Sequence, residues 1–304
     1  NEGKRERKIS PFVGETIGEA TLTAITKKQT IEAPAQQLSL LEVFNSNISK
    51  EAVEIKQEEP TTEITYLSYS QLQTFQTCPL HYKLRYILKL PSPPSPALSY
   101  GVSVHGALRD FFQLQQQEEP ITSQTMSDML KKNWSNQGFS SKSHEQQTYK
   151  QAETMLLRIA NEAIQKPPEI VAVETPFQFW IKGLKIGGRI DRIDRLPDDK
   201  IEIIDYKTGK NVPTEKKVRE DLQLSLYALA ASEVKDAILG KQPNDIVLTL
   251  YYVEDDIKIS TTRTQEDLEK AKAFILERVE EIRTSTFQCS RSMLCKNCEY
   301  MMMC

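Results

Sequence analysis

The chain has 304 residues, of which 39% are hydrophobic and 27% are charged, and its formal net charge at pH 7 is −3. This composition is typical of a globular protein with long exposed helices. It excludes nucleic-acid binding driven by overall charge, so that such a role would need a local basic surface. No run of about 18 apolar residues is present, which excludes a membrane-spanning helix of ordinary length.

Residues 1–63 carry little hydrophobic periodicity and include the acidic, glutamine-containing stretch KQEEPTTE. We expect them to form a linker or tail, with one short docking element over residues 38–44. Their opening stretch, KRERKISPFVGETIGEA, is similar to the C-terminal edge of UvrD-like helicase cores, in which a basic stretch runs into a Ser-x-Phe pair. Since the sequence begins at Asn1 rather than at methionine, we also expect it to be part of a longer protein.

The remaining residues, 64–304, are predicted to form one ordered domain that begins with helices. Ser68 or Ser70 can cap the first helix, which Pro79 interrupts and restarts. The stretch PSPPSP at 91–96 predicts an irregular loop. Further helices are predicted over residues 102–115, 122–134 and 144–165.

The hydrophobic period then changes from that of helices to that of strands. Strands are predicted over residues 171–180, 184–194, 201–206, 246–253 and 257–261, and helices over 215–235 and 265–283. Short turns join the first three strands, which therefore form a meander. This order of elements predicts an α/β domain with a mixed central sheet flanked by helices on both faces.

An unusual pair of charges ends the third predicted strand. Because strand side chains alternate between faces, an isoleucine row of this strand continues into Asp205 and Lys207. A hairpin would bring Asp191, on the preceding strand, beside Asp205. Two neighbouring carboxylates repel unless a cation neutralises them, and a hard divalent metal with oxygen ligands does so. An isolated acid-x-lysine is also common as a surface ion pair, so these residues alone leave both interpretations open.

Further motifs carry a resemblance to a known family. The stretches GRID, which ends on Asp191, and IIDYKTGK, which contains Asp205 and Lys207, resemble the PD-(D/E)XK nucleases of the RecB type. This branch adds a G-x-x-x-H helix, matched by the helix that contains His105. It also adds a Q-x-x-x-Y helix after the lysine, matched by Gln223 and Tyr227. Residues four apart share one face of a helix, so the last two side chains would lie together.

The resemblance implies a role for each matched residue. His105, Asp191 and Asp205 would bind Mg²⁺ or Mn²⁺, with the backbone carbonyl of Tyr206 as a further ligand. Lys207 would be the catalytic lysine. Gln223 and Tyr227 would contact the DNA backbone or position the active site. Taken alone, a histidine on an apolar helix face is more often a core residue, and Tyr227 fits helix packing as well.

Other charged residues near these motifs receive no firm role. Glu174 and Arg189 are expected near the site but are not assigned to it, and Asp194 has the opposite parity to Asp191 and is expected to face away. The basic residues that follow the site could contact phosphates or form a solvated helix end; they are Lys210, Lys216, Lys217 and Arg219.

Three of the five cysteines lie in the C-terminal stretch LCKNCEYMMMC, at Cys295, Cys298 and Cys304. A tetrahedral thiolate site needs a fourth ligand, for which spacing alone allows either Cys289 or Cys78. The methionines at 301–303 are expected to pack around such a site. Metal ligation by thiols indicates a reducing, intracellular location.

The cysteine pattern resembles iron-sulfur nucleases of the AddB type and of the CRISPR-associated RecB-like group. These place a Cys-Pro before the G-x-x-x-H element, matched by Cys78, and three cysteines at the end of the domain. The resemblance implies a structural [4Fe–4S] cluster that joins the two ends of the domain, with Cys289 spare. Its four ligands would be Cys78, Cys295, Cys298 and Cys304. A zinc site that uses Cys289 is the alternative.

Together these resemblances imply a metal-dependent DNA nuclease, with exonuclease action on single-stranded ends and a role in DNA repair or recombination. The similarity of the first residues to a helicase core implies that a helicase domain acts with it, in cis or in trans. One alternative is a stand-alone CRISPR-associated nuclease, and another is a module of the same fold that binds DNA without cutting it.

Overall fold

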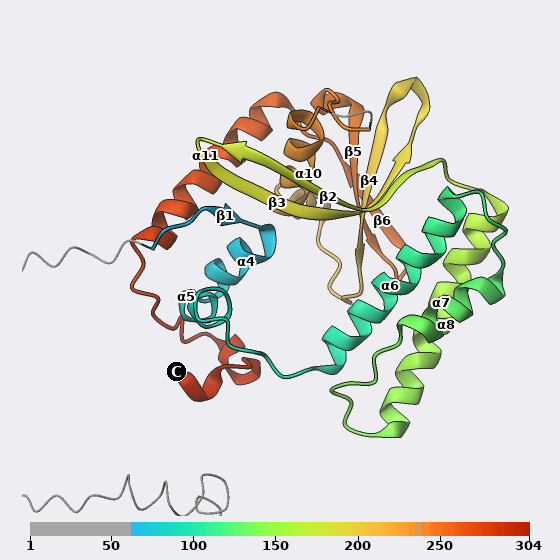
Figure 1. Cartoon of the computed structure of the whole chain (residues 1–304), viewed down its shortest axis with the longest axis horizontal. Helices are drawn as coiled ribbons and strands as arrows, with labels where there is room; N and C mark the ends of the chain where they lie inside the picture. The colour runs from blue at the N-terminus through green and yellow to red at the C-terminus, as the bar shows by residue number, and fades with distance from the viewer. Residues whose placement is uncertain (1–61, 236–237) are drawn as a thin grey trace, which may run out of the picture. The chain divides into compact units, whose positions relative to one another are not determined.

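The computed structural model describes residues 62–235 and 238–304, and the elements below carry the labels of Figure 1. The predictions for residues 1–63, including the docking element and the helicase-like stretch, therefore lie almost wholly outside the described residues. Within these ranges the α-helices are α4 (Tyr69–Thr77), α5 (Pro79–Tyr82), α6 (Pro96–Gln116), α7 (Ser123–Asn133), α8 (Lys142–Gln165), α9 (Glu215–Arg219), α10 (Leu222–Glu233) and α11 (Gln265–Arg283).

The strands form one mixed sheet. They are β1 (Tyr66–Leu67), β2 (Ile170–Ile181), β3 (Leu184–Arg195), β4 (Ile201–Lys207), β5 (Ile246–Tyr252) and β6 (Ile257–Thr261). Their order is β1-β3-β4-β5-β6, and β2 pairs along the other edge of β3. The β1–β3 and β4–β5 pairs are parallel, whereas β2–β3, β3–β4 and β5–β6 are antiparallel. The predicted meander of three strands and the mixed sheet are confirmed.

Helices cover both faces of the sheet, as predicted, and each face has its own hydrophobic core (Figure 1). The first core packs residues of α4, α10 and α11 against one face. The second packs α6, α7 and α8 against the other face, where Ile204 and Tyr206 of β4 contribute. Within the ranges that the structure describes, no helix is both long and apolar enough to cross a membrane.

Two helices differ from the sequence prediction by more than two residues, each because of a cap. The helix predicted over 102–115 begins at Pro96, since the Ser95 side chain accepts a hydrogen bond from the Leu98 N–H and proline is tolerated in the first turn. The single helix predicted over 215–235 is two helices, because Asp221 caps a new helix by accepting from the Leu224 N–H. Ser68 caps α4 through a capping box, as one of the two predicted alternatives had it.

A glycine sets how closely α6 approaches α7. An added Cβ at Gly106 would lie 2.6 Å from Asn133 Oδ1 and 2.9 Å from its Cγ. Asn133 cannot easily move aside, because its side chain is bonded to Arg109, to Asp110 and to the Met129 carbonyl. The α6–α7 contact therefore depends on the absence of a side chain at this position.

We predict that Gly106→Ala lowers the free energy of unfolding by about 1–3 kcal/mol through overpacking. Gly101→Ala is the matched control, because its Cβ would make only an ordinary contact of 3.4 Å with Thr208 Oγ1. That control should gain stability, by up to about 1 kcal/mol, from the better helix propensity of alanine. Urea unfolding followed by circular dichroism measures both. Equal effects of the two substitutions would contradict the packing argument.

Candidate active site

Besides a register shift between Ile170 and Ala172, the β2–β3 hairpin departs from regular alternation near the middle of both of its strands. In β2, Ala172 and Phe177 both enter the first core although their positions differ by an odd number, and in β3 the same holds for Ile190 and Ile193. Regular alternation would place such pairs on opposite faces. Each strand therefore shifts its alternation, β2 around Glu174 and β3 around Asp191.

Glu174 shows the irregularity directly, because its φ is 51°, a left-handed value that is uncommon for a residue with a side chain. Residues held in this region cluster at functional sites. The flanking register, Val173 with Arg192 and Thr175 with Ile190, sets Glu174 opposite Asp191. The bend of the hairpin thus places two carboxylates next to each other.

A histidine from the neighbouring helix completes a group of potential metal ligands. His105 of α6 has its Nδ1 3.5 Å from Asp191 Oδ2. One ligand atom each from His105, Glu174 and Asp191 all lie within 4.8 Å of one another. Among the residues that the structure describes, this is the one group of three or more histidine, cysteine or carboxylate side chains that is so compact. Nitrogen and carboxylate oxygen ligands suit Mg²⁺, Mn²⁺ and similar ions.

The charges of this group are coupled. Burial raises the pKa of Glu174, and the nearby charge of Asp191 raises it further, although Arg189 and His105 act in the opposite direction. Burial lowers the pKa of His105, but the hydrogen bond and the charge of Asp191 outweigh it, so this pKa is raised. A bound cation would relieve the repulsion between the carboxylates.

A second group lies at the end of β4, where Asp205 is almost completely buried. Lys207 Nζ lies 2.7 Å from Asp205 Oδ2. On the other carboxylate oxygen, Oδ1, Gln223 Nε2 donates at 2.7 Å and the Tyr227 hydroxyl donates at 2.8 Å. Lys207 Nζ also donates to Gln223 Oε1 at 2.7 Å. Gln223 and Tyr227 of α10 therefore hold the acid and the lysine in one geometry.

Burial and the ion pair have opposing effects on the pKa values of this second group. It raises the pKa of Asp205, against the opposing effect of the Lys207 charge. Burial lowers the pKa of Lys207, but the attraction of Asp205 outweighs it and this pKa is raised. Among the described residues the Lys207 ammonium is the one group that engages the buried Asp205 Oδ2, so a cation bound at this oxygen would share it with Lys207.

The backbone between the acid and the lysine joins the two groups. The Tyr206 N–H donates to Asp191 Oδ2 at 2.8 Å. On the reverse face of the sheet, Arg192 Nη1 donates to the Tyr206 hydroxyl at 3.0 Å. Arg192 Nη2 also lies 2.8 Å from Asp194 Oδ2, so that Asp194 is paired with this arginine. The proposed ligand role of the Tyr206 carbonyl stays a prediction.

The structure thus brings together the residues that the sequence motifs singled out, and it adds Glu174, which the sequence analysis placed nearby without a role. The register of the hairpin could have identified Glu174 as a site residue from the sequence, because a turn at 182–183 pairs residue 174 with residue 191. The basic residues that follow the site, Lys210, Lys216, Lys217 and Arg219, are exposed.

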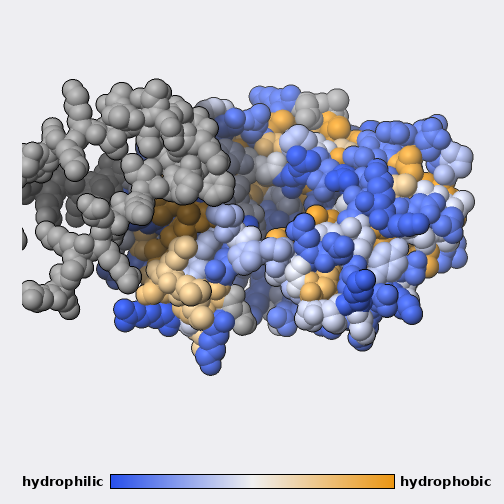
Figure 2. All heavy atoms as spheres, turned by 60° about the horizontal axis from the view of Figure 1, so that its bottom comes forward, coloured by the Kyte–Doolittle hydropathy of each residue, from blue (hydrophilic) through white to orange (hydrophobic). Residues whose placement is uncertain are grey.

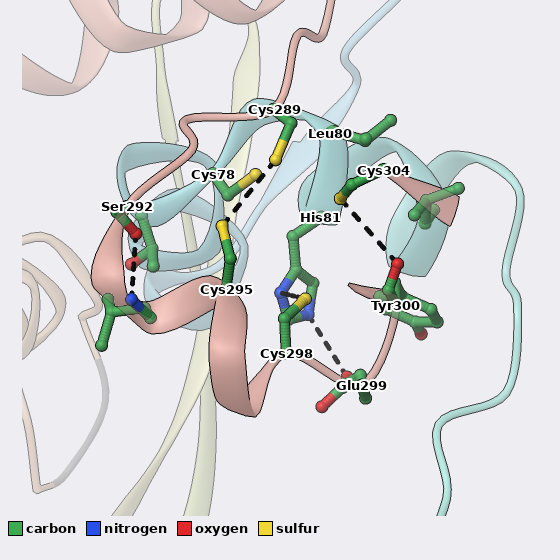
Figure 3. Close-up of a pocket in the computed structure, with 13 residues that line it drawn as sticks. Cys78, Leu80, His81, Cys289, Ser292, Cys295, Cys298, Glu299, Tyr300 and Cys304 are labelled. Atoms are coloured by element: carbon green, nitrogen blue, oxygen red, sulfur yellow. Dashed lines mark hydrogen bonds and ion pairs between the residues drawn. The ribbon is translucent and has the colours of Figure 1, made fainter. Parts of the chain in front are cut away.

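All five cysteines line one cavity, of about 240 Å³, between the start of the domain and its C-terminal segment (Figure 3). Cys289 Sγ lies 3.9 Å from Cys295 Sγ, and Cys298 Sγ lies 4.0 Å from His81 Nδ1. No cysteine belongs to the compact ligand group within the described ranges. The structure therefore does not separate Cys289 from the other four, and it does not draw the thiols into a set that could hold a single ion.

The expectation that the C-terminal methionines pack around the cysteines is wrong. Met302 is 97% exposed, and Met301 and Met303 are more than half exposed. The face shown in Figure 2 is mostly hydrophilic but carries a patch of hydrophobic side chains. The C-terminal segment contributes exposed apolar residues of this kind, since Met293 and Leu294 are also exposed.

Comparison with known proteins identifies the family. The model of the PD-(D/E)XK nuclease superfamily matches residues 66–304, so the chain belongs to this superfamily. The chain is therefore a nuclease of a class that uses divalent metal ions, and its His105–Glu174–Asp191 group is a possible metal site.

Solved structures resemble the chain more distantly. A crystal structure from Eubacterium rectale named "Putative exonuclease" has 15% sequence identity and a TM-score of 0.48, and the match covers 87% of this chain and 93% of that one. The crystal structure of SSO0001 has 16% identity and a TM-score of 0.33, with 74% and 93% covered. Among curated protein sequences, none matches the chain.

We predict that Mn²⁺ raises the melting temperature of the protein, because an ion at 100 times its dissociation constant stabilises the folded state by about 2.7 kcal/mol. Glu174→Gln should lose most of this increase, since the amide is a weaker ligand and carries no charge. Glu169→Gln, whose side chain is 71% exposed beside Arg195, is the control and should keep it. Equal stabilisation of all three proteins by Mn²⁺ would remove Glu174 from the site.

Proposed function

We propose that the chain is a Mg²⁺- or Mn²⁺-dependent deoxyribonuclease that hydrolyses phosphodiester bonds and acts as an exonuclease on single-stranded DNA ends. The observation that carries the proposal is the meeting of a compact histidine–carboxylate group with a buried acid–lysine pair. The first contains Asp191, the second contains Asp205, and the Tyr206 N–H joins them.

The residues fit a divalent cation. His105, Glu174 and Asp191 offer one nitrogen and two carboxylate ligands, and Asp205 offers a buried oxygen, Oδ2, that the Lys207 ammonium contacts. When bound, such an ion polarises the phosphate and lowers the pKa of a coordinated water. Asp205 would join the other ligands, which requires Lys207 to share it with the ion.

The protein's own residues orient the reactants. Lys207, whose side chain is partly exposed, contacts Asp205 Oδ2, and its ammonium can hold an attacking water or stabilise charge that develops on the phosphate. The Gln223 amide and the Tyr227 hydroxyl both donate to Asp205, so we assign these two residues to positioning this carboxylate rather than to binding the DNA backbone.

The cellular setting of the proposal rests on resemblance. The RecB-type motifs support single-stranded ends as substrate and a role in DNA repair or recombination. The helicase-like opening stretch supports a helicase domain in cis or in trans, and a stand-alone CRISPR-associated nuclease is the alternative. A binding module that does not cut is disfavoured, because each residue of the family motif is present. An intracellular, reducing location agrees with the five unpaired cysteines.

We predict that Lys207→Ala and Asp205→Asn each lower the rate of cleavage about 100-fold or more, as the loss of one preorganised charge does in other enzymes. Asp205→Asn should also weaken Mn²⁺ binding, whereas Lys207→Ala should not. The assay is Mg²⁺-dependent release of nucleotides from end-labelled single-stranded DNA. Lys270→Ala, on the exposed face of α11, is the control. Cleavage by either site variant at the wild-type rate would overturn the assignment.

We further propose that the cysteine cavity holds a structural [4Fe–4S] cluster ligated by Cys78, Cys295, Cys298 and Cys304. The gathering of all five thiols around one cavity supports it. A single zinc ion needs Zn–S bonds of about 2.3 Å and hence thiols that all lie close together, whereas a four-iron cluster spaces its ligands farther apart. The cluster would join the α4–α5 junction to the C-terminal segment. Cys289, beside Cys295, keeps the zinc alternative open.

In the cluster proposal Cys78 is a ligand and Cys289 is not. We therefore predict that Cys78→Ala abolishes the broad visible absorbance near roughly 400 nm that thiolate-ligated iron gives. It should also lower stability by about 2–5 kcal/mol, as the loss of a long-range crosslink does. Cys289→Ala should stay coloured and stable. Iron and zinc analysis with thermal melts measures both; a colourless protein with one zinc, destabilised by Cys289→Ala alone, would support the zinc site instead.

A further inference from the structure

One face of the β2–β3 hairpin is buried and the other is open. Towards the first core the hairpin presents Phe177, Phe179, Ile181, Leu184, Ile186 and Ile190. The residues between them alternate onto the opposite face, and Pro176, Gln178, Trp180 and Arg189 are exposed there. We call this face the hairpin track; it consists of Pro176, Gln178, Trp180, Lys185, Gly187 and Arg189, together with Tyr66 of β1.

Two exposed aromatic side chains lie on the hairpin track. Trp180 is 66% exposed and Tyr66 is 42% exposed. In the sheet, Trp180 pairs with Lys185, and Lys185 pairs with Tyr66, so that a cation stands between two aromatic residues on three neighbouring strands. Gly187 makes room for one ring, because a Cβ at this position would lie 2.8 Å from Tyr66 Cε2.

The hairpin track leads directly to the metal ligands. Arg189 Nε, at its inner end, lies 3.4 Å from Glu174 Oε2. Beyond Glu174, a hollow of about 450 Å³ opens between this residue and α6, and His105 also lines it. Lys185 is six residues from Asp191, which corresponds to about 20 Å along an extended strand. The aromatic row therefore stands a few nucleotides away from the candidate site.

The charge of the hairpin track suits a polyanion. It carries Lys185 and Arg189 and no acidic residue of its own. Lys185 forms no ion pair with any residue in the part of the chain that the structure describes. The acids at its inner end, Glu174 and Asp191, are those of the candidate metal site. Aromatic side chains beside cations are the usual means by which proteins bind single-stranded nucleic acids, through base stacking and phosphate contacts.

We infer that the hairpin track binds single-stranded DNA next to the metal site, with nucleobases stacked on Trp180 and Tyr66 and phosphates held by Lys185 and Arg189. The inference rests on the proposed function, to which it adds the surface that receives the single strand and the residues that bind its bases and phosphates. A duplex cannot use this surface in the same way, because its bases are already paired and stacked. The hairpin track thus selects unpaired strands without reading their sequence.

The chain offers a direct optical test, because Trp180 is one of its two tryptophans. The other, Trp134, is packed against Phe139 and Tyr149 away from the hairpin. In Trp134→Phe the emission reports Trp180 alone, and in Trp180→Phe it reports Trp134 alone. Titration with a 12-nucleotide oligo(dT) in EDTA, which prevents cleavage, should quench the first protein and leave the second unchanged. Quenching of both, or of neither, would contradict stacking on Trp180.

The affinity for oligo(dT) in the same metal-free buffer measures how much Trp180 contributes to binding. Trp180→Ala should weaken oligo(dT) binding about 5- to 150-fold, the range measured for loss of one stacked base, whereas Trp180→Phe should stay close to wild type. Ile257→Ala, an exposed apolar residue on β6, is the control. Melting temperatures verify that each variant is folded. Wild-type affinity of Trp180→Ala, or equal competition by a duplex of the same length, would overturn the inference.

The remaining outcomes separate this inference from the proposed function. A wild-type protein that binds oligo(dT) through Trp180 but never cleaves it with Mg²⁺ would overturn the proposed function alone. A protein that cleaves but whose Trp180→Ala variant binds normally would overturn the hairpin track alone. Self-association that Trp180→Ala abolishes, seen by sedimentation velocity without an effect on DNA binding, would make this face a contact between copies of the chain and would also overturn it.

Discussion

Three carboxylates meet where the β2–β3 hairpin bends, and the repulsion among them is the constraint on which the rest of the site depends. Burial raises the pKa of both Glu174 and Asp205, and the charge of Asp191 raises both further. His105 and Lys207 supply the nearest balancing charges, and a backbone N–H of β4 bonds Asp191. These donors offset part of the repulsion among the carboxylates, and a bound divalent cation would offset more of it.

The bend also connects the two faces of the sheet. Asp205 is held from α10 on one face, and His105 reaches the site from α6, which covers the other. A flat hairpin with regular alternation would keep these contributions apart. Beyond the bend, the hairpin stays packed on the first core but extends past the second, to which none of residues 175–190 belongs, and this leaves the face with Trp180 exposed. One irregularity thus accounts for both the compact ligand group and the exposed surface beside it.

Much of the fold could be predicted from periodicity, because strands and long helices bury one face and their patterns differ. The acid-x-lysine on β4 could be recognised in the sequence, because burying charges at the end of a row of isoleucines is unfavourable and therefore indicates a function for them. The role of Glu174 was not predicted, because a single acid within a strand is not distinctive in the sequence. Its role depends on a left-handed φ and on the register with β3. The break between α9 and α10 at Asp221 was not predicted, because the apolar pattern of this segment also fits one continuous helix. The Asp221 side chain instead bonds the backbone and starts a new helix.

The position of a bound Mn²⁺ ion in a crystal, found from its anomalous scattering, tests the central claim most directly. The account predicts one strong peak at the bend of the hairpin, within about 2–2.5 Å of ligand atoms from His105, Glu174 and Asp191, with Asp205 turned towards it. A peak elsewhere, or none at Mn²⁺ concentrations that support DNA cleavage, would contradict the account and require a different catalytic site.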